Sequence, residues 1–262
     1  MFRVKEVPMP VLAGLLSALR SGAVEVLDLT APLSASTPVL QLPPPFSNTT
    51  SFRLEEISRY DERGPRWYWN DIHTGEHVGT HVDAPNHWLS GKDGASVDQI
   101  PLSTFVAPAA VLDASAKVAQ NPDFLLGVDD IRAWEREHGP LPDGGWLLYR
   151  TGWDARSGDQ DDFLNDTHTP GVSAECAQWL ADEAPIAGFG VETVGTDAGQ
   201  AAGMEPMFPC HDRLLGSGKC GLTQLRNLAQ LPPTGSVLVV SPLPIVGGSG
   251  SPARVYALVE RS

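Results

Sequence analysis

The chain has 262 residues, enough for one large domain with a substantial core. Hydrophobic residues make up 42% of it and charged residues 19%, as is usual for a soluble globular protein. The formal net charge is −14, from 18 basic and 32 acidic residues. This charge argues against nucleic acid or an anionic membrane as a partner, because both require basic patches.

The first predicted element is an amphipathic helix over about residues 10–21. Its apolar run, preceded by Arg3 and Lys5, superficially resembles a signal peptide. Arg20 follows the run at once, however, and no small-residue cleavage pattern leads to a new mature start. No apolar run approaches the roughly 18 residues that span a bilayer, so we expect no membrane segment.

Strands and helices then alternate along the chain. Apolar or alternating runs predict strands at 24–29, 67–72, 106–112, 146–150, 187–194, 236–240 and 254–259. Two helices are predicted, over 129–138 with Asp129 as cap and Gly139-Pro140 as stop, and over 173–182 opened by Ser173. Residues 32–50 are rich in Pro, Ser and Thr and are predicted to form a long irregular segment.

The excess of strands over helices predicts a mixed α/β domain with a curved or partly closed sheet, rather than a regular doubly wound one. Neither a repeat nor a low-complexity linker divides the chain, so residues 1–262 are expected to form a single domain. Three cysteines without paired spacing, Cys176, Cys210 and Cys220, indicate reduced thiols and a cytoplasmic setting. Cys210 and Cys220 could in principle form a disulfide.

The most informative segment is residues 77–87, which read His-Val-Gly-Thr-His-Val-Asp-Ala-Pro-Asn-His. Four of the seven histidines lie in or beside this segment. Neutral imidazoles and a carboxylate are the usual donors to a divalent first-row metal. The alternative is a polar loop with a chance run of histidines. The pattern favours an active site built on a metal.

The spacing of these residues favours an extended segment over a helix. Three poor helix formers lie within it, and Pro85 excludes a helix just beyond. Because side chains alternate along an extended chain, His77, His81 and Asp83 are predicted to share one face. His87 is expected beyond the bend at Pro85, near a metal-bound water but not consumed as a ligand.

A second polar segment, residues 195–211, runs from a glycine-rich turn into a loop that ends in His211. Loops after strands are where sites are often built, and Gln200 together with His211 favours a functional loop. For Asp197 alone, a cap on backbone amides is an equal alternative. The glycine-rich segment 247–252 lacks the lysine and the helix of a phosphate-binding loop, so it either lines a pocket or forms a surface turn.

The motif in residues 77–87 resembles that of the cyclase family of metal-dependent hydrolases, which includes bacterial kynurenine formamidases and isatin hydrolases. The resemblance covers most of the chain and implies a swivelling β/β/α fold, generally dimeric or larger, so we expect a homodimer. It further implies that His77, His81 and Asp83 ligate the metal and that His87 is the catalytic base.

Within the family the finer resemblance is to isatin hydrolases, in residues 69–93, 122–126 and 195–206. In that subgroup a glutamine matching Gln200 completes a single-manganese site, which implies one Mn²⁺ per chain, with Zn²⁺ as the alternative. Formamidases instead hold a second metal through a histidine and a glutamate, and the position of that glutamate is Thr223 here. A neutral hydroxyl cannot replace the charge of a bridging carboxylate, which favours isatin hydrolase over formamidase.

The resemblance therefore implies a hydrolase that opens the cyclic amide (lactam) of isatin to isatinate through a metal-activated water. The alternative enzyme is an arylformamidase that hydrolyses N-formylkynurenine to kynurenine and formate. A non-enzymatic alternative is a metal-binding module in which His87 has no catalytic task. Four aromatic residues are expected to wall a flat substrate: Phe46, Trp67, Trp69 and Trp88. His211 would donate a hydrogen bond to a substrate carbonyl or product carboxylate, or serve the structure alone.

Overall fold

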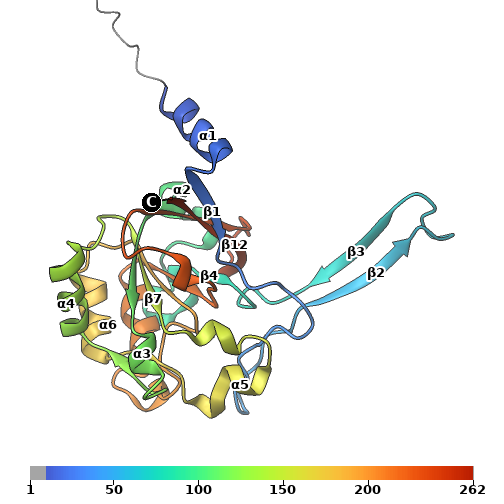
Figure 1. The fold of residues 1–262 in the computed structure, drawn as a ribbon. Helices are drawn as coiled ribbons and strands as arrows, with labels where there is room; N and C mark the ends of the chain where they lie inside the picture. Colours follow the sequence, from blue (N-terminus) through green and yellow to red (C-terminus); the bar gives the residue numbers. More distant parts are fainter. Residues whose placement is uncertain (1–9, 262) are drawn as a thin grey trace, which may run out of the picture.

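The computed structural model describes residues 10–261, and Figure 1 shows their arrangement. The strands of its largest sheet are β1 (Val24–Asp28), β4 (His81–Asp83), β5 (Val106–Asp113), β7 (Trp146–Arg150), β9 (Gly188–Val191), β10 (Cys220–Thr223), β11 (Ser236–Pro242) and β12 (Gly250–Glu260). Their order is β1-β12-β11-β5-β7-β9-β10-β4, and β4 also pairs with β12, which closes all of them except β1 into a barrel. Strands β5, β7, β9 and β10 run parallel, and the other pairings are antiparallel. The predicted mixed α/β class with a closed sheet is confirmed.

The helices of the described residues are α1 (Val11–Ser21), α2 (Leu102–Phe105), α3 (Ser115–Val118), α4 (Val128–His138), α5 (Gln160–Leu164) and α6 (Ala174–Asp182). Ser173 caps α6 as predicted, because its Oγ accepts a hydrogen bond from the Cys176 N–H. The predicted cap Asp129 of α4 is wrong. The helix begins one residue earlier, and the Asp130 carboxylate accepts from the N–H of Gly127 instead. Arg3 and Lys5 lie outside the described residues.

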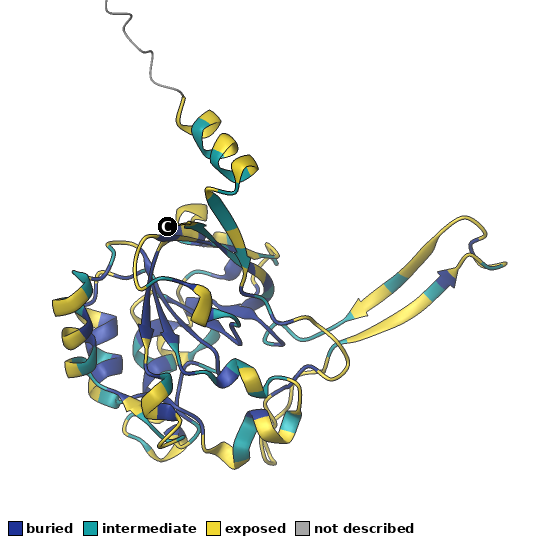
Figure 2. Ribbon diagram, viewed as in Figure 1, coloured by how far each residue is buried: buried dark blue, intermediate teal, exposed yellow. Residues whose placement is uncertain are grey.

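Alternate side chains of the barrel strands point inward and outward, as a pleated strand requires. In β7, Trp146 and Leu148 belong to the core inside the barrel, whereas Leu147 and Tyr149 face outward. Helices α4 and α6 cover that outer face with their own apolar residues. Figure 2 shows that burial is concentrated in these strands. The barrel is therefore the rigid frame on which the motif is mounted.

The predicted strands are found, but their lengths differ. The strand predicted at 187–194 is shorter in the structure, where only β9 is formed. The strand predicted at 254–259 is part of the longer β12. The segment predicted to be extended over 77–83 is a strand only at β4, because Gly79 turns the chain with a φ of +67°. Strand β10 was not predicted at all. Within residues 10–261, none of the helices has the length and apolar character that crossing a bilayer requires.

Strands β2 (Arg53–Arg59) and β3 (Tyr68–His73) form a separate hairpin that projects from the barrel (Figure 1). Figure 2 shows that most of its surface is exposed. The irregular segment 32–50 precedes it, as predicted. A further small sheet pairs β6 (Leu125–Leu126) with β8 (Gly171–Val172). The hairpin is the largest part of the fold that does not pack on the barrel.

Candidate metal centre

Strand β4 places His81 and Asp83 in the wall of the barrel. Asp83 lies opposite Gly221 of β10 on one side and Gly250 of β12 on the other. A Cβ on Gly221 would lie 2.8 Å from Oδ2 of Asp83, and one on Gly250 would lie 2.6 Å from Cε1 of His77. These two glycines therefore leave the room that the carboxylate and the imidazole occupy.

The polar side chains of the motif lie in contact. Nδ1 of His77 is 2.8 Å from Oδ1 of Asp83, and Nε2 of His81 is 3.3 Å from the same oxygen. The 3₁₀ turn Pro85–His87 folds the chain back, so that the ring of His87 stacks on that of His77 at a centroid distance of 3.9 Å. One nitrogen or oxygen from each of His77, Asp83 and His87 lies within 4.8 Å of the others. His87 thus lies among the candidate donors themselves.

Burial and neighbouring charges set the ionisation of this cluster. Burial alone would raise the pKa of Asp83, but the imidazoles of His81 and His77 outweigh it and hold the pKa well below its usual range. Burial lowers the pKa of His87 to about 4. Asp83 is therefore an anion at neutral pH. His87 is a neutral imidazole with a lone pair available to a proton or a metal.

The donor set fits a divalent cation. The hydroxyl of Ser249 donates to Oε2 of Glu76 at 2.6 Å, so its oxygen accepts from Nε2–H of His77 at 2.9 Å. In its neutral form, His77 then carries its lone pair on Nδ1, which faces the ionised Asp83. Nδ1 of His77 and Oδ1 of Asp83 would then both be acceptors at 2.8 Å, so a proton or a cation has to lie between them. Imidazole and carboxylate are ligands that divalent first-row metals take.

His81 has its own supports. Its Nδ1 lies 2.7 Å from the carbonyl oxygen of Gly79, and a protonated Nδ1 would leave the lone pair of Nε2 directed at the Asp83 side. Oγ1 of Thr223 lies 2.9 Å from Nδ1 and 3.1 Å from Nε2. Thr223 occupies the position at which formamidases are expected to hold a metal-binding glutamate. Its hydroxyl therefore contacts His81 in place of that carboxylate.

Asp197 orients His211 at the edge of the cluster. Its Oδ2 lies 2.5 Å from Nδ1 of His211 and accepts from the backbone N–H of the same residue at 2.9 Å, while Oδ1 accepts from the N–H of Cys210. Burial alone would lower the pKa of His211, but the carboxylates of Asp197 and Asp83 raise it. Asp197 therefore caps two backbone amides, as one alternative predicted, and also contacts the imidazole of His211.

Aromatic side chains flank these histidines. The ring of Trp88 lies 4.9 Å from that of His211 and 6.1 Å from that of His87, measured between centroids. Phe208 packs on Trp88 at 5.7 Å. Trp88 is among the residues predicted to wall a substrate, whereas Phe208, which packs on it, is not. The signal that could have found Phe208 is its place within the polar loop 195–211.

Four residues that the sequence assigned to metal or substrate are not brought to the cluster. The amide of exposed Gln200 donates to the carbonyl oxygen and the hydroxyl of Thr167, at 3.0 and 3.1 Å. No hydrogen bond joins it to the clustered imidazoles in the part of the chain that the structure describes. Trp69 is 54% exposed and Trp67 49% exposed on the projecting hairpin, and Phe46 is 64% exposed in the preceding loop. Trp67 and Trp69 are close to the motif in sequence, but the hairpin leads this part of the chain away from the barrel.

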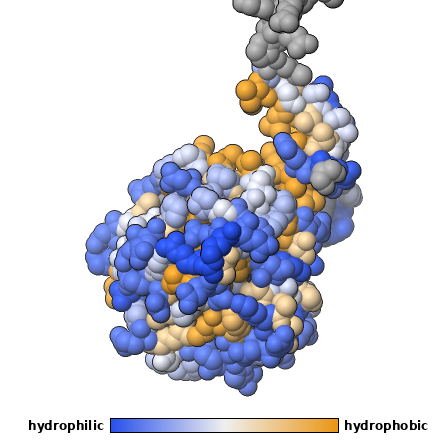
Figure 3. All heavy atoms as spheres, turned by 60° about the vertical axis from the view of Figure 1, so that its left-hand side comes forward, coloured by the Kyte–Doolittle hydropathy of each residue, from blue (hydrophilic) through white to orange (hydrophobic). Residues whose placement is uncertain are grey.

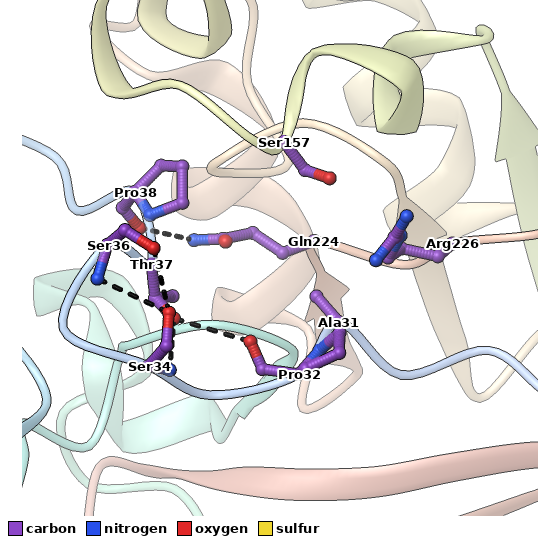
Figure 4. A pocket seen from close by; sticks show the side chains of 9 residues that line it. All are labelled: Ala31, Pro32, Ser34, Ser36, Thr37, Pro38, Ser157, Gln224 and Arg226. Atoms are coloured by element: carbon purple, nitrogen blue, oxygen red, sulfur yellow. Dashed lines mark hydrogen bonds between the residues drawn. The ribbon is translucent and has the colours of Figure 1, made fainter.

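A separate polar hollow lies beside Gln224 and is drawn in Figure 4. Its lining includes Ser157 and Arg226 and none of the clustered histidines. The Gln224 amide donates to the carbonyl oxygen of Pro38 at 3.2 Å and so ties the irregular segment to the barrel. The hollow contains neither a carboxylate nor an imidazole, so we assign the chemistry to the histidine cluster.

Comparisons with known sequences and structures indicate one family. Residues 27–198 match the model of the Cyclase family. Isatin hydrolase of Roseibium aggregatum is 46% identical over 258 residues, which cover 96% of this chain and 98% of that protein. The structure of an isatin hydrolase bound to the product analogue thioisatinate has a TM-score of 0.93 and 45% identity, covering 97% of this chain and 100% of that one. Kynurenine formamidase of Salinibacter ruber is 34% identical over 179 residues, 68% of this chain and 74% of the relative.

Proposed function

The chain belongs to the Cyclase family, and on this basis we propose that it is a metal-dependent hydrolase that opens the lactam of isatin to isatinate. One observation carries the proposal. His77 and His81 both contact one oxygen of Asp83, and neutral His87 stacks on His77. This cluster lies in a fold that superimposes on an isatin hydrolase holding a product analogue.

The proposed ligands of a single divalent ion are His77, His81 and Asp83. When bound, such an ion lowers the pKa of a water and polarises a substrate carbonyl. We propose Mn²⁺, with Zn²⁺ as the alternative, because two imidazoles and a carboxylate are harder donors than the thiolates of many zinc sites. Gln200 is left out of this set because its exposed amide N–H donates to Thr167 and no hydrogen bond joins it to the cluster within residues 10–261.

The chain's own groups then have distinct roles. Water adds to the lactam carbonyl carbon and the carbon–nitrogen bond breaks, so one water proton must move to the anilide nitrogen. Neutral His87 is placed to accept that proton and to return it. The other water proton leaves to solvent as the product ionises to isatinate. His211, held by Asp197 through Nδ1, can donate from Nε2 to a substrate carbonyl or to the product carboxylate. Trp88 with Phe208 offers an apolar wall to the aromatic ring.

Substrate preference tests this proposal directly. We expect kcat/KM for isatin to exceed that for N-formylkynurenine by at least about tenfold, because a site shaped for one ring system places the other amide poorly. Both substrates are assayed with the same metal-loaded preparation, and His87→Ala prepared in parallel controls for contaminating hydrolases. A preference for N-formylkynurenine would establish the arylformamidase alternative that the Salinibacter relative represents. Turnover of neither substrate would leave a metal-binding module.

Metal content is the second test. Protein stripped with a chelator is expected to regain isatin turnover with about one equivalent of Mn²⁺ per chain, and at least as fully as with Zn²⁺. Elemental analysis of the reactivated protein gives the stoichiometry. We expect a single ion because Thr223 offers no carboxylate to bridge two. Two ions per chain about 3.5 Å apart would therefore contradict the proposal.

We further propose a homodimer in which the projecting hairpin packs on a second copy. A lone two-stranded hairpin is marginally stable in water, yet this one exposes 52% of Leu54, 68% of Tyr60 and 67% of Ile72. Apolar surface also gathers on α1 (Figure 3), where Val11 and Leu12 are exposed. Sedimentation should give twice the chain mass of 28.0 kDa, and a monomer at micromolar concentration would contradict this.

The proposed location is the cytoplasm, which the three free and buried cysteines support.

A further inference from the structure

The glycine-rich segment 247–250 packs against His77. It leads into β12, whose Gly250 pairs with Asp83. A Cβ on Gly248 would lie 2.9 Å from Oε1 of Glu76, and one on Gly250 would lie 2.4 Å from the carbonyl oxygen of Val82. A side chain at Gly250 would push the loop away from the motif, because it would meet backbone, and one at Gly248 would have to displace the Glu76 carboxylate. The segment is therefore a close-approach loop of the site and not a plain surface turn.

Ser249 lies between these glycines and is held at several points. Its N–H and its Oγ both donate to Oε2 of Glu76, at 3.2 and 2.6 Å. Its carbonyl oxygen accepts from the N–H of Ala84 at 2.9 Å. The same Oγ lies 2.9 Å from Nε2 of His77. Carboxylate, hydroxyl and imidazole thus form one continuous chain of hydrogen bonds.

We propose that Glu76 and Ser249 are positioning residues of the metal centre, which fix the tautomer and the direction of the His77 ring. The Ser249 proton is committed to the carboxylate, so the ring must present N–H at Nε2 and keep the lone pair of Nδ1 on the side of Asp83. The inference rests on the proposed role of His77 as a ligand. Groups that hold a metal-binding imidazole in this way typically contribute about 10- to 100-fold to metal affinity.

Metal affinity of the full-length protein tests this proposal. Calorimetric titration of metal-free Ser249→Ala with Mn²⁺ is expected to give a Kd about 10- to 100-fold weaker than that of the unaltered chain. Ser249→Thr retains the hydroxyl and should restore most of the affinity. Glu76→Gln should weaken binding less than Ser249→Ala, because its amide oxygen can still accept from the hydroxyl.

A spectroscopic readout separates positioning from general damage to the loop. In ¹⁵N-labelled metal-free protein, His77 should show the Nε2–H tautomer, and Ser249→Ala should show a mixture of tautomers. Ser251→Ala is the matched control. It makes the same change two residues along, and among residues 10–261 its hydroxyl bonds only Leu243 N–H and the Pro252 carbonyl oxygen.

The outcomes distinguish this inference from the proposed function. If the unaltered protein does not bind Mn²⁺, the metal centre itself is wrong and the positioning role falls with it. If it binds, an unchanged Kd in Ser249→Ala, or an equal loss in Ser251→Ala, overturns the positioning role alone. Should Ser249→Ala fail to fold, Glu76→Ala carries the test, because it removes the acceptor of the Ser249 proton. A Kd and a tautomer identical to those of the unaltered chain would then overturn the proposal.

Discussion

Replacing His77, His81 or Asp83 with alanine is expected to abolish isatin hydrolysis and to remove the metal. The three side chains meet at one carboxylate oxygen, with Nδ1 of His77 at 2.8 Å and Nε2 of His81 at 3.3 Å. Removing one of three ligands leaves too few donors to retain the ion at ordinary concentrations. The fold should survive, because the apolar core inside the barrel does not depend on these polar groups.

His73→Ala is the matched control for this set. His73 lies beside the motif, but it ends the hairpin strand β3, where its Nε2 contacts Glu55 at 3.0 Å. This variant should keep its metal and its turnover. Elemental analysis that found a full metal complement in all three ligand variants would contradict the assignment of the site, and so would an equal loss of metal in His73→Ala.

Changing His87 to alanine is expected to lower turnover by about 100- to 10,000-fold, the usual contribution of a positioned acid–base group. Burial lowers the pKa of this imidazole to about 4, so it is neutral near pH 7 and its lone pair is free. Its metal occupancy should change little if the ligands are His77, His81 and Asp83. Both turnover and occupancy have to be measured on the same preparation.

The stacking of His87 on His77 makes this variant decisive between two roles. If His87 binds the metal or only supports His77, the alanine variant should bind the metal roughly 10- to 100-fold more weakly. Its activity should then fall only in proportion to the metal lost. Activity that returned fully at high metal concentration would therefore exclude His87 as the base. A kcat that stays low at saturating metal supports it.

The sequence was sufficient to find the motif because its donors are close along the chain. His77, His81 and Asp83 are four and two residues apart, so any tight backbone path brings them together. The predicted path, an extended segment over 77–83, was only partly right. Gly79 turns the chain at a φ of +67°, and contact among the donors arises from that turn.

The supports of the site could not be predicted, because they come from distant segments. Ser249 lies 172 residues beyond His77, and Thr223 lies 142 residues beyond His81. Only the closing of the barrel brings β10 and β12 to either side of β4. Trp67 and Trp69 are near the motif in sequence, but both are about half exposed, and the hairpin that contains them projects from the barrel. Position along a chain predicts contact only where no element intervenes.

An anomalous difference map tests the central claim most directly. Crystals of the protein reloaded with Mn²⁺ should show, in data collected above the manganese absorption edge, one peak per chain bound by His77, His81 and Asp83. The distances to their nitrogen and oxygen atoms should be about 2.0 to 2.3 Å. A map with no peak at this cluster, or with its peak held by other residues, would contradict the account.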